Sequence, residues 1–255
     1  MGFAEHGGHP GSGEMELEEY ARIADAEQRH WWYRSMPALA GAVLGPSLRP
    51  RLRILDAGCG PGANFDWLSA YGEVAGVDTS PEALRLARSR HPDMDVAEGD
   101  ITALPFEDET FDLALEITVL TVVEHDQLGV DELARVTRRG GHVMLMEPAI
   151  PRLRRAHDEV VHSRRRYRLD DLRAMASRAG LGVRRATHAN SFLVPPAAML
   201  ALAHRARGPN ASSGSDFDRD RLGWLFGALA GLERRVLARR DVPFGLSAIV
   251  VAERL

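Results

Sequence analysis

The stretch Gly58-Cys59-Gly60-Pro61-Gly62 restricts the fold more than any other part of this sequence, because it places three glycines in a five-residue turn. It follows the apolar segment 53–56 and precedes a helical pattern that carries Phe65 and Leu68 on one face. Glycine permits a tight turn and lets a ligand approach the backbone closely. A glycine turn between a strand and a helix is typical of α/β proteins that bind nucleotides, although the turn alone does not say which nucleotide.

Strand and helix patterns alternate after this turn, which predicts an α/β fold with a mostly parallel sheet and helices on both faces. Ser80 and Pro81 predict a capped helix start. We expect a helix at 131–138 that ends at Gly140-Gly141, and a break at Pro37 within the helical region 16–44, because a proline inside a helix removes a backbone hydrogen bond. Strands are expected at 53–56, 74–77, around Val96, and at 111–115, 142–146, 181–187 and 247–253.

The pattern divides the chain into five parts. We expect a flexible N-terminus at 1–15, a helical lid at 16–47, a ligand-binding core at 48–190, an inserted helical segment at 191–243 and a last core strand at 244–255. The inserted segment contains two helical stretches and a polar loop.

Composition excludes several classes of protein. The 255 residues include one cysteine, Cys59, so no intrachain disulfide can form and a reducing compartment is expected. No apolar run approaches the roughly 18 residues of a membrane span, and the N-terminus lacks the apolar region of a signal peptide, so we expect a cytoplasmic protein. All basic side chains other than histidine are arginines, which favours a bacterial source with GC-rich codons. A net charge of -4 argues against a general nucleic-acid binder.

Three aspartates follow the first three expected strands. Asp56 precedes the glycine turn, where a carboxylate would oppose a pyrophosphate but suits a cationic amino-acid ligand. Asp78 lies about 20 residues beyond the glycines, the spacing at which an acidic residue binds ribose hydroxyls. Asp100 follows Gly99, and its carboxylate can accept a hydrogen bond from an adenine amino group. For Asp78 or Asp100 taken singly, capping of a helix or loop is the alternative.

Together these segments resemble the class I S-adenosylmethionine-dependent methyltransferases, in particular the type 11 group. The resemblance covers roughly residues 53–148 and also includes Leu104-Pro105-Phe106, Phe111-Asp112-Leu113 and the segment from Leu133-Ala134-Arg135-Val136 to Gly140-Gly141. It implies a Rossmann-like, seven-stranded sheet whose last strand is antiparallel, with S-adenosylmethionine as the cofactor. The cofactor-binding residues that it implies are Asp56, Gly58, Cys59, Gly60, Gly62, Asp78, Thr79, Asp100, Ile101 and Glu116. For Cys59, a small packed residue is the interpretation that we favour over a catalytic thiol.

The N-terminal segment His30-Trp31-Trp32-Tyr33-Arg34 is similar to a helix that precedes the core in a subset of these enzymes, which act on surface glycans and natural products. That resemblance implies a lid in which Trp32 and Arg34 contact the cofactor, with Arg34 pairing to its carboxylate. The alternative is that both tryptophans pack the helix on the sheet.

Catalytic residues are less clearly marked. Glu116 follows the fourth strand, and His125 and His162 are candidate bases, because a histidine near neutral pH can deprotonate a hydroxyl group. Many relatives carry a Glu-His pair after this strand, whereas this chain has Thr121-Val122 there and Glu124-His125 slightly later. Glu116 can equally cap a loop, and surface or structural roles remain open for each histidine. No histidine spacing indicates a metal site.

We expect a small-molecule or lipid-linked acceptor, such as a glycan or natural product, and O-methylation. The segment 222–239 is a basic amphipathic helix that can touch a membrane surface, or else pack on the core or form a dimer. The alternatives for the whole protein are a methyltransferase acting on protein or nucleic acid, a non-catalytic cofactor-binding regulator, and a dinucleotide dehydrogenase.

Overall fold

A computed structural model describes residues 31–153, 163–199 and 223–255, with the side chains of residues 31–34 and of Pro46 left out. The expectations for the first 30 residues, for His162 and for the polar loop at 208–215 therefore lie outside the described residues. No helix among the described residues is long and apolar enough to cross a membrane.

Seven strands form one sheet in the order β3-β2-β1-β4-β5-β7-β6. β7 runs antiparallel to both of its neighbours, whereas the other neighbouring pairs are parallel. This arrangement confirms the expected fold. The strands are β1 (Leu52–Ala57), β2 (Gly72–Asp78), β3 (Asp95–Glu98), β4 (Phe111–Ile117), β5 (Thr137–Pro148), β6 (Leu181–Ala189) and β7 (Ser247–Arg254).

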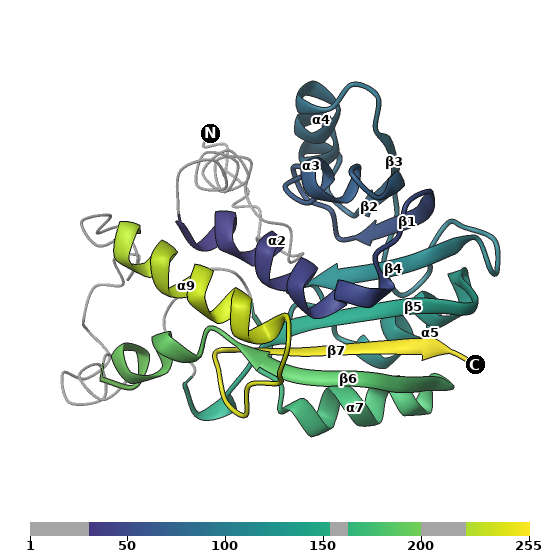
Figure 1. The fold of residues 1–255 in the computed structure, drawn as a ribbon. Coiled ribbons are helices and arrows are strands. Elements are labelled where there is room, and N and C mark those ends of the chain that lie inside the picture. Colours follow the sequence, from purple (N-terminus) through teal and green to yellow (C-terminus); the bar gives the residue numbers. More distant parts are fainter. Residues whose placement is uncertain (1–30, 154–162, 200–222) are drawn as a thin grey trace, which may run out of the picture.

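Helices cover both faces of the sheet (Figure 1). α2 (Trp31–Leu44) and α9 (Gly223–Leu237) lie side by side on one face, and α5 (Asp126–Val136) and α7 (Leu169–Arg178) pack on the other. The short α3 (Phe65–Leu68) and α4 (Pro81–Arg90) adjoin β2 and β3. Three 3-10 turns lie at Gly45–Ser47, Pro151–Leu153 and Ser191–Leu193, and residues 194–199 are helical.

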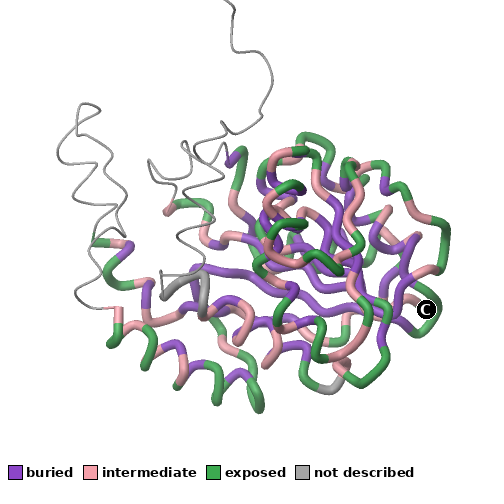
Figure 2. The backbone as a smooth tube through the Cα atoms, turned by 90° about the horizontal axis from the view of Figure 1, so that it is seen from above, coloured by how far each residue is buried: buried purple, intermediate pink, exposed green. Residues whose placement is uncertain are grey.

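Alternate side chains of the central strands supply two cores. Leu113 and Leu115 of β4 join the core beneath α2, whereas Ala114 between them joins the core beneath α5 and α7. This two-residue period is the ordinary geometry of a strand. The central strands are buried along most of their length in Figure 2, and the outward faces of the helices are exposed. The sheet is thus a fixed platform whose carboxyl edge can carry a site.

The N-terminal helix corrects one expectation, because Pro37 lies inside a continuous α2 and does not split it. The buried side chains of Met36, Leu39, Ala40 and Val43 hold the helix on the sheet on both sides of the proline. Burial of this apolar face outweighs the one backbone hydrogen bond that proline removes.

The boundary between α5 and β5 is a second correction. α5 ends at Val136, and Gly140-Gly141 lies inside β5 rather than terminating a helix that reaches Arg138. The Oγ1 of Thr137 donates to the Leu133 carbonyl at 2.7 Å and closes the helix there. Arg138 then pairs with the buried Asp112 of β4, which draws the chain into the sheet. In contrast, the Ser80 cap is confirmed, with its side chain accepting from Ala83 N–H at 3.2 Å.

Candidate functional site

The glycine turn lies at the carboxyl end of β1, with Gly58, Gly60 and Gly62 at φ values of +78°, +52° and +90°. These are left-handed conformations that side-chain-bearing residues rarely adopt. The N–H of Gly58 donates to the Val77 carbonyl at 2.7 Å, which fastens the turn to β2. A Cβ on Gly60 would meet nothing within 4 Å, so the backbone at this position faces open space. The turn therefore offers a ligand an accessible stretch of main chain.

Asp78 ends β2 and fixes the turn from the other side. Its Oδ2 accepts from Gly60 N–H and its Oδ1 from Ser80 N–H, each at 2.9 Å. Burial raises the pKa of this carboxyl, and the backbone hydrogen bonds oppose that shift. The carboxylate thus connects the glycine turn with the start of α4, and the exposed Thr79 lies beside it.

Asp56 and Cys59 lie beneath the turn. Asp56 is only 1% exposed, and both of its carboxylate oxygens accept from the Nδ2 of Asn64 at 3.2 Å. Cys59 is buried with Phe65 and Leu84. Burial and the charges of Asp56 and Asp78 raise the pKa of the Cys59 thiol, so the side chain stays neutral. Cys59 is consequently a packing residue, as we favoured from the sequence.

Asp100 and Ile101 follow β3. Asp100 is exposed, and its Oδ1 accepts from the N–H and the Oγ1 of Thr102, both at 2.8 Å. Ile101 is 5% exposed and belongs to the core beneath α5. Asp100 therefore caps its own loop and still presents its carboxylate to solvent, at the position where an adenine is expected.

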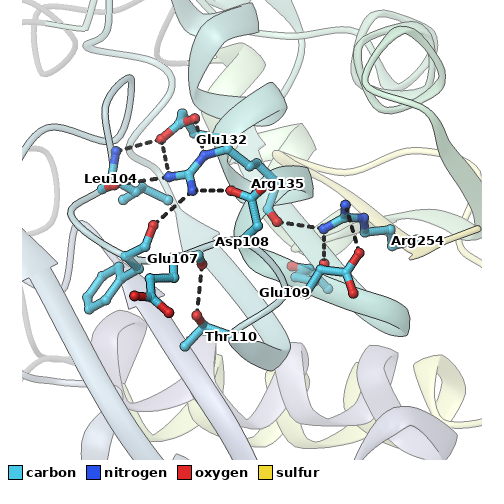
Figure 3. Close-up of polar contacts among 10 residues, drawn as sticks. Leu104, Glu107, Asp108, Glu109, Thr110, Glu132, Arg135 and Arg254 are labelled. Carbon is cyan, nitrogen blue, oxygen red and sulfur yellow. Dashed lines mark hydrogen bonds and ion pairs between the residues drawn. The ribbon is translucent and has the colours of Figure 1, made fainter.

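The loop after this aspartate is held by Arg135 of α5 (Figure 3). Its guanidinium donates to the carbonyls of Leu104 and Phe106 at 3.0 and 2.8 Å, and to Asp108 Oδ1 at 2.7 Å. It also pairs with Glu132, whose Oε2 accepts from Leu104 N–H at 2.8 Å. Two segments that carry the sequence resemblance, 104–106 and 133–136, thus form one polar cluster that fixes the loop between β3 and β4.

Two glutamates at the carboxyl ends of β4 and β5 are both 0% exposed. Glu116 accepts from Val119 N–H at 3.1 Å through Oε2 and from Met146 N–H at 3.0 Å through Oε1. Glu147 accepts from Thr121 N–H at 3.2 Å through Oε1. Burial raises the pKa of both carboxyls, of Glu116 to about 7 and of Glu147 well above the ordinary value. Sequence reasoning identified Glu116 but missed Glu147, which reads as an ordinary residue at the end of a strand.

The segment 163–168, which contains the arginine-rich run, lies against the same edge. Ser163 Oγ and Thr121 Oγ1 are 2.7 Å apart, and Arg164 N–H donates to the Thr121 carbonyl at 2.8 Å. The buried Tyr167 donates its hydroxyl to Asp126 Oδ2 at 2.6 Å. These bonds fasten the segment to the loop that follows β4. At position 121, where many relatives carry the glutamate of a Glu-His pair, this chain therefore has a threonine that holds two segments together.

Comparison with known proteins identifies a domain within this chain. A family model described as a methyltransferase domain matches residues 55–145, the part that contains the glycine turn, Asp78, Asp100 and Glu116. The chain carries a class I S-adenosylmethionine-dependent methyltransferase domain.

Named relatives match half of this chain or less. The malonyl-[acyl-carrier protein] O-methyltransferase of Erwinia billingiae is 34% identical over 130 residues, which are 50% of this chain and 51% of that protein. The phosphatidylethanolamine N-methyltransferase of Cereibacter sphaeroides is 34% identical over 100 residues, 37% of this chain and 49% of that protein. The chain spans about half the length of these curated relatives.

Similarity to solved structures extends further along the chain but shows the fold alone. A Haloferax volcanii methyltransferase solved with the activator Trm112 superposes with a TM-score of 0.63 at 19% identity. The match covers 95% of this chain and 99% of that one.

The residues of the methyltransferase domain fit S-adenosylmethionine. Gly60 leaves the space that a Cβ would fill, and Asp78 and Asp100 lie at the ends of neighbouring strands. Gly58, Cys59, Gly60, Gly62, Asp56 and Asp78 come together in the structure as expected. Glu116 is fully buried and accepts from the N–H of Val119, whose side chain lies against Gly58.

Of the remaining expected catalytic and lid residues, the structure describes the side chain of His125 alone. His125 is exposed at the start of α5, and its side chain makes no capping hydrogen bond. Trp32 and Arg34 lie in α2, and their side chains are not described. His162 lies outside the described residues altogether, so the roles of these three residues stay predictions.

Proposed function

We propose that this protein transfers the methyl group of S-adenosylmethionine to a small-molecule or lipid-linked acceptor, by O-methylation. The observation that supports the proposal best is the glycine turn closed by Asp78 at the carboxyl edge of the sheet, inside a matched methyltransferase domain. By their names, the relatives methylate malonyl-[acyl-carrier protein] and phosphatidylethanolamine, and neither acceptor is a nucleic acid.

The chain's own task in this reaction is alignment. The cofactor supplies a methyl group that its sulfonium already makes electrophilic, so holding the acceptor in line lowers the barrier most. Asp78 fixes the turn against which the cofactor would lie. Glu116 is fully buried and cannot take a proton from the acceptor directly, which leaves His125 and His162 as the proposed bases if the acceptor is a hydroxyl.

Calorimetry with S-adenosylmethionine, S-adenosylhomocysteine and NAD tests the cofactor. We expect selective binding of the two sulfur ligands that Asp78→Ala abolishes, because the glycine turn loses the acceptor for Gly60 N–H. Asp131→Ala, an exposed carboxylate on α5, is the matched control and should bind as the wild type does. Binding of NAD instead, or of no ligand, would contradict the proposal.

We further propose that residues 191–243 form the acceptor side and that α9 contacts an anionic lipid surface. α9 turns Ala230, Glu233 and Leu237 inward and leaves an apolar set exposed on the other side: Trp224, Leu225, Leu232 and Val236. Four exposed arginines accompany that set: Arg234, Arg235, Arg239 and Arg240. The only acidic residue of α9, Glu233, is buried. A helix with exposed aromatic and aliphatic side chains among arginines suits a negatively charged membrane interface.

Co-sedimentation with vesicles tests this contact. Vesicles of phosphatidylglycerol and phosphatidylcholine should retain the protein at low salt, and vesicles of phosphatidylcholine alone should not. Trp224→Ser with Leu232→Ser should release it, whereas Val122→Ser, an exposed apolar residue away from α9, should not. Equal binding by the double variant, or a concentration-dependent dimer without vesicle binding, would overturn the membrane contact.

A further inference from the structure

Glu116 and Glu147 face the same side of the sheet from adjacent strands. Glu116 is opposite Leu145 in the parallel pairing of β4 with β5, and Glu147 lies two residues further along β5, so its side chain points the same way as that of Leu145. Both side chains are fully buried at the end of the core beneath α5 and α7. Two carboxyl groups thus share a site without solvent.

The hydrogen bonds of the two groups differ. Both oxygens of Glu116 accept from backbone N–H groups, those of Val119 and Met146. Glu147 accepts from Thr121 N–H through Oε1, whereas its buried Oε2 accepts no hydrogen bond from any described residue. A protonated carboxyl has one O–H donor to place, and an ionised one has none. Oε2 of Glu147 is therefore the position for a proton, and Glu116 is the neighbouring acceptor.

Two ionised carboxylates cannot remain side by side in a buried site, because like charges in a medium of low polarity repel strongly. We propose that Glu147 is a neutral carboxylic acid that donates its proton to the Glu116 carboxylate, and that this shared proton holds residues 118–121 against the glycine turn. Both glutamates are positioning residues that act on the cofactor site through the loop. The inference rests on the proposed function, since it concerns binding of the cofactor.

The loop reaches the cofactor site through Val119. A Cβ on Gly58 would lie 2.3 Å from Val119 Cγ2, so the valine side chain already lies against the first glycine of the turn. Glu116 holds the N–H of Val119, and Glu147 holds that of Thr121. Thr118, at the start of the loop, has a φ of +61°, a conformation that its surroundings must maintain. Loss of either carboxyl contact would free the part of the loop that packs on Gly58.

Among the described residues, the charged groups around the pair are bonded to other partners and do not neutralise it. Tyr167 faces Glu147 from the segment 163–168, and its hydroxyl is committed to Asp126. Arg165 pairs with Asp126 and lies over the Tyr167 ring at 4.6 Å. Burial and the charge of Glu116 raise the pKa of Glu147. The shared proton is consequently held to a higher pH than that of an ordinary carboxyl group. It is lost as the pH rises further, after which the two charges repel and the loop loosens.

Affinity for S-adenosylhomocysteine, measured by calorimetry from about pH 6 to about pH 9.5, tests the shared proton. This ligand lacks the sulfonium, so attraction between a cation and the new negative charge does not mask the effect. Wild-type affinity should fall with rising pH, by at most about tenfold per unit, the limit for one linked proton. Glu147→Gln should bind as the wild type does at low pH and show no such fall, because its amide donates to Glu116 at every pH.

Glu116→Gln distinguishes the donor from the acceptor. Its single amide oxygen cannot serve both Val119 and Met146, so affinity should be weaker at every pH. Glu233→Gln, another buried glutamate that accepts from backbone N–H groups, should keep the wild-type pH profile. A wild-type protein with pH-independent affinity, or a Glu147→Gln variant with the wild-type slope, would overturn the inference. Absence of binding at every pH would instead refute the proposed function.

Discussion

At the scale of single residues, the glycine turn shows how two neighbouring glycines can have different reasons to be glycine. Gly58 has a φ of +78° and has Val119 in the place of a side chain, whereas Gly60 has a φ of +52° and open space around it. The first is required by packing as well as by conformation. The second is required by conformation and by the room that a ligand would need.

Alanine substitutions separate these reasons. Gly60→Ala should lower the free energy of unfolding by about 1–2 kcal/mol, the usual cost of a left-handed conformation at a residue with a Cβ. Gly58→Ala should cost more, about 3 kcal/mol or above, because the new Cβ also displaces Val119. Urea denaturation measures both. Affinity for S-adenosylmethionine, unlike stability, should fall in both variants, because both glycines belong to the turn against which the cofactor would lie. Equal losses of stability would show that the contact with Val119 relaxes freely.

Glu147 shows why part of the site could not be predicted from sequence. Ser80 and the glycine turn are local patterns, so their roles follow from a few adjacent residues. Glu116 and Glu147 are 31 residues apart and meet only because β4 pairs with β5 in one register. Neither residue type nor spacing contains that information. In contrast, the spacing of Asp78 from the glycines is a property of the strand–helix–strand unit, so its position at the end of the second strand could be predicted from the sequence.

At the scale of elements, the loop between β3 and β4 has no helix and is held by the guanidinium groups of Arg135 and Arg254. Arg135 donates to two loop carbonyls and to two carboxylates, which raise its pKa. Arg254 of β7 adds a second fixed point, since its guanidinium pairs with Glu109 at 3.3 Å and donates to the Arg135 carbonyl. Two motifs that are separate in the sequence, 104–106 and 133–136, are therefore held together by hydrogen bonds in the structure (Figure 3).

Arg135→Met should lower the free energy of unfolding by about 2 kcal/mol, because the Leu104 and Phe106 carbonyls lose a charged donor. Arg139→Met, whose side chain is 74% exposed, is the control and should change stability by less than about 0.5 kcal/mol. Hydrogen exchange should show faster opening of residues 100–110 in Arg135→Met alone. Unchanged protection of that loop would mean that backbone packing, rather than the guanidinium, holds it.

At the scale of the whole molecule, the sheet carries buried groups whose titrations change the stability of the protein in opposite directions as the pH changes. Burial lowers the pKa of His188 on β6, and its Nδ1 makes no hydrogen bond with any described residue. A histidine with a lowered folded-state pKa binds fewer protons when folded, so its contribution to stability is lost as the pH falls below about 6.5. The glutamate pair, with raised pKa values, loses its contribution as the pH rises.

The difference in unfolding free energy between wild type and His188→Gln isolates the histidine. The wild type should lose stability relative to the variant as the pH falls from about 7 to about 5. Denaturation by urea at several pH values measures this difference. His125→Gln, at an exposed position, should follow the wild type throughout. A pH-independent difference between wild type and His188→Gln would mean that His188 titrates alike in the folded and unfolded states.

The antiparallel β7 lies between β5 and β6 although it follows both in the chain. During synthesis on the ribosome, β5 and β6 therefore emerge first and have no direct partner in each other. Their facing edges stay unpaired until residues 247–254 have left the exit tunnel. Unpaired strand edges are where nascent chains associate wrongly. The sheet is complete only when β7 has paired with both β5 and β6, so we expect the nascent protein to need chaperone protection until β7 has emerged.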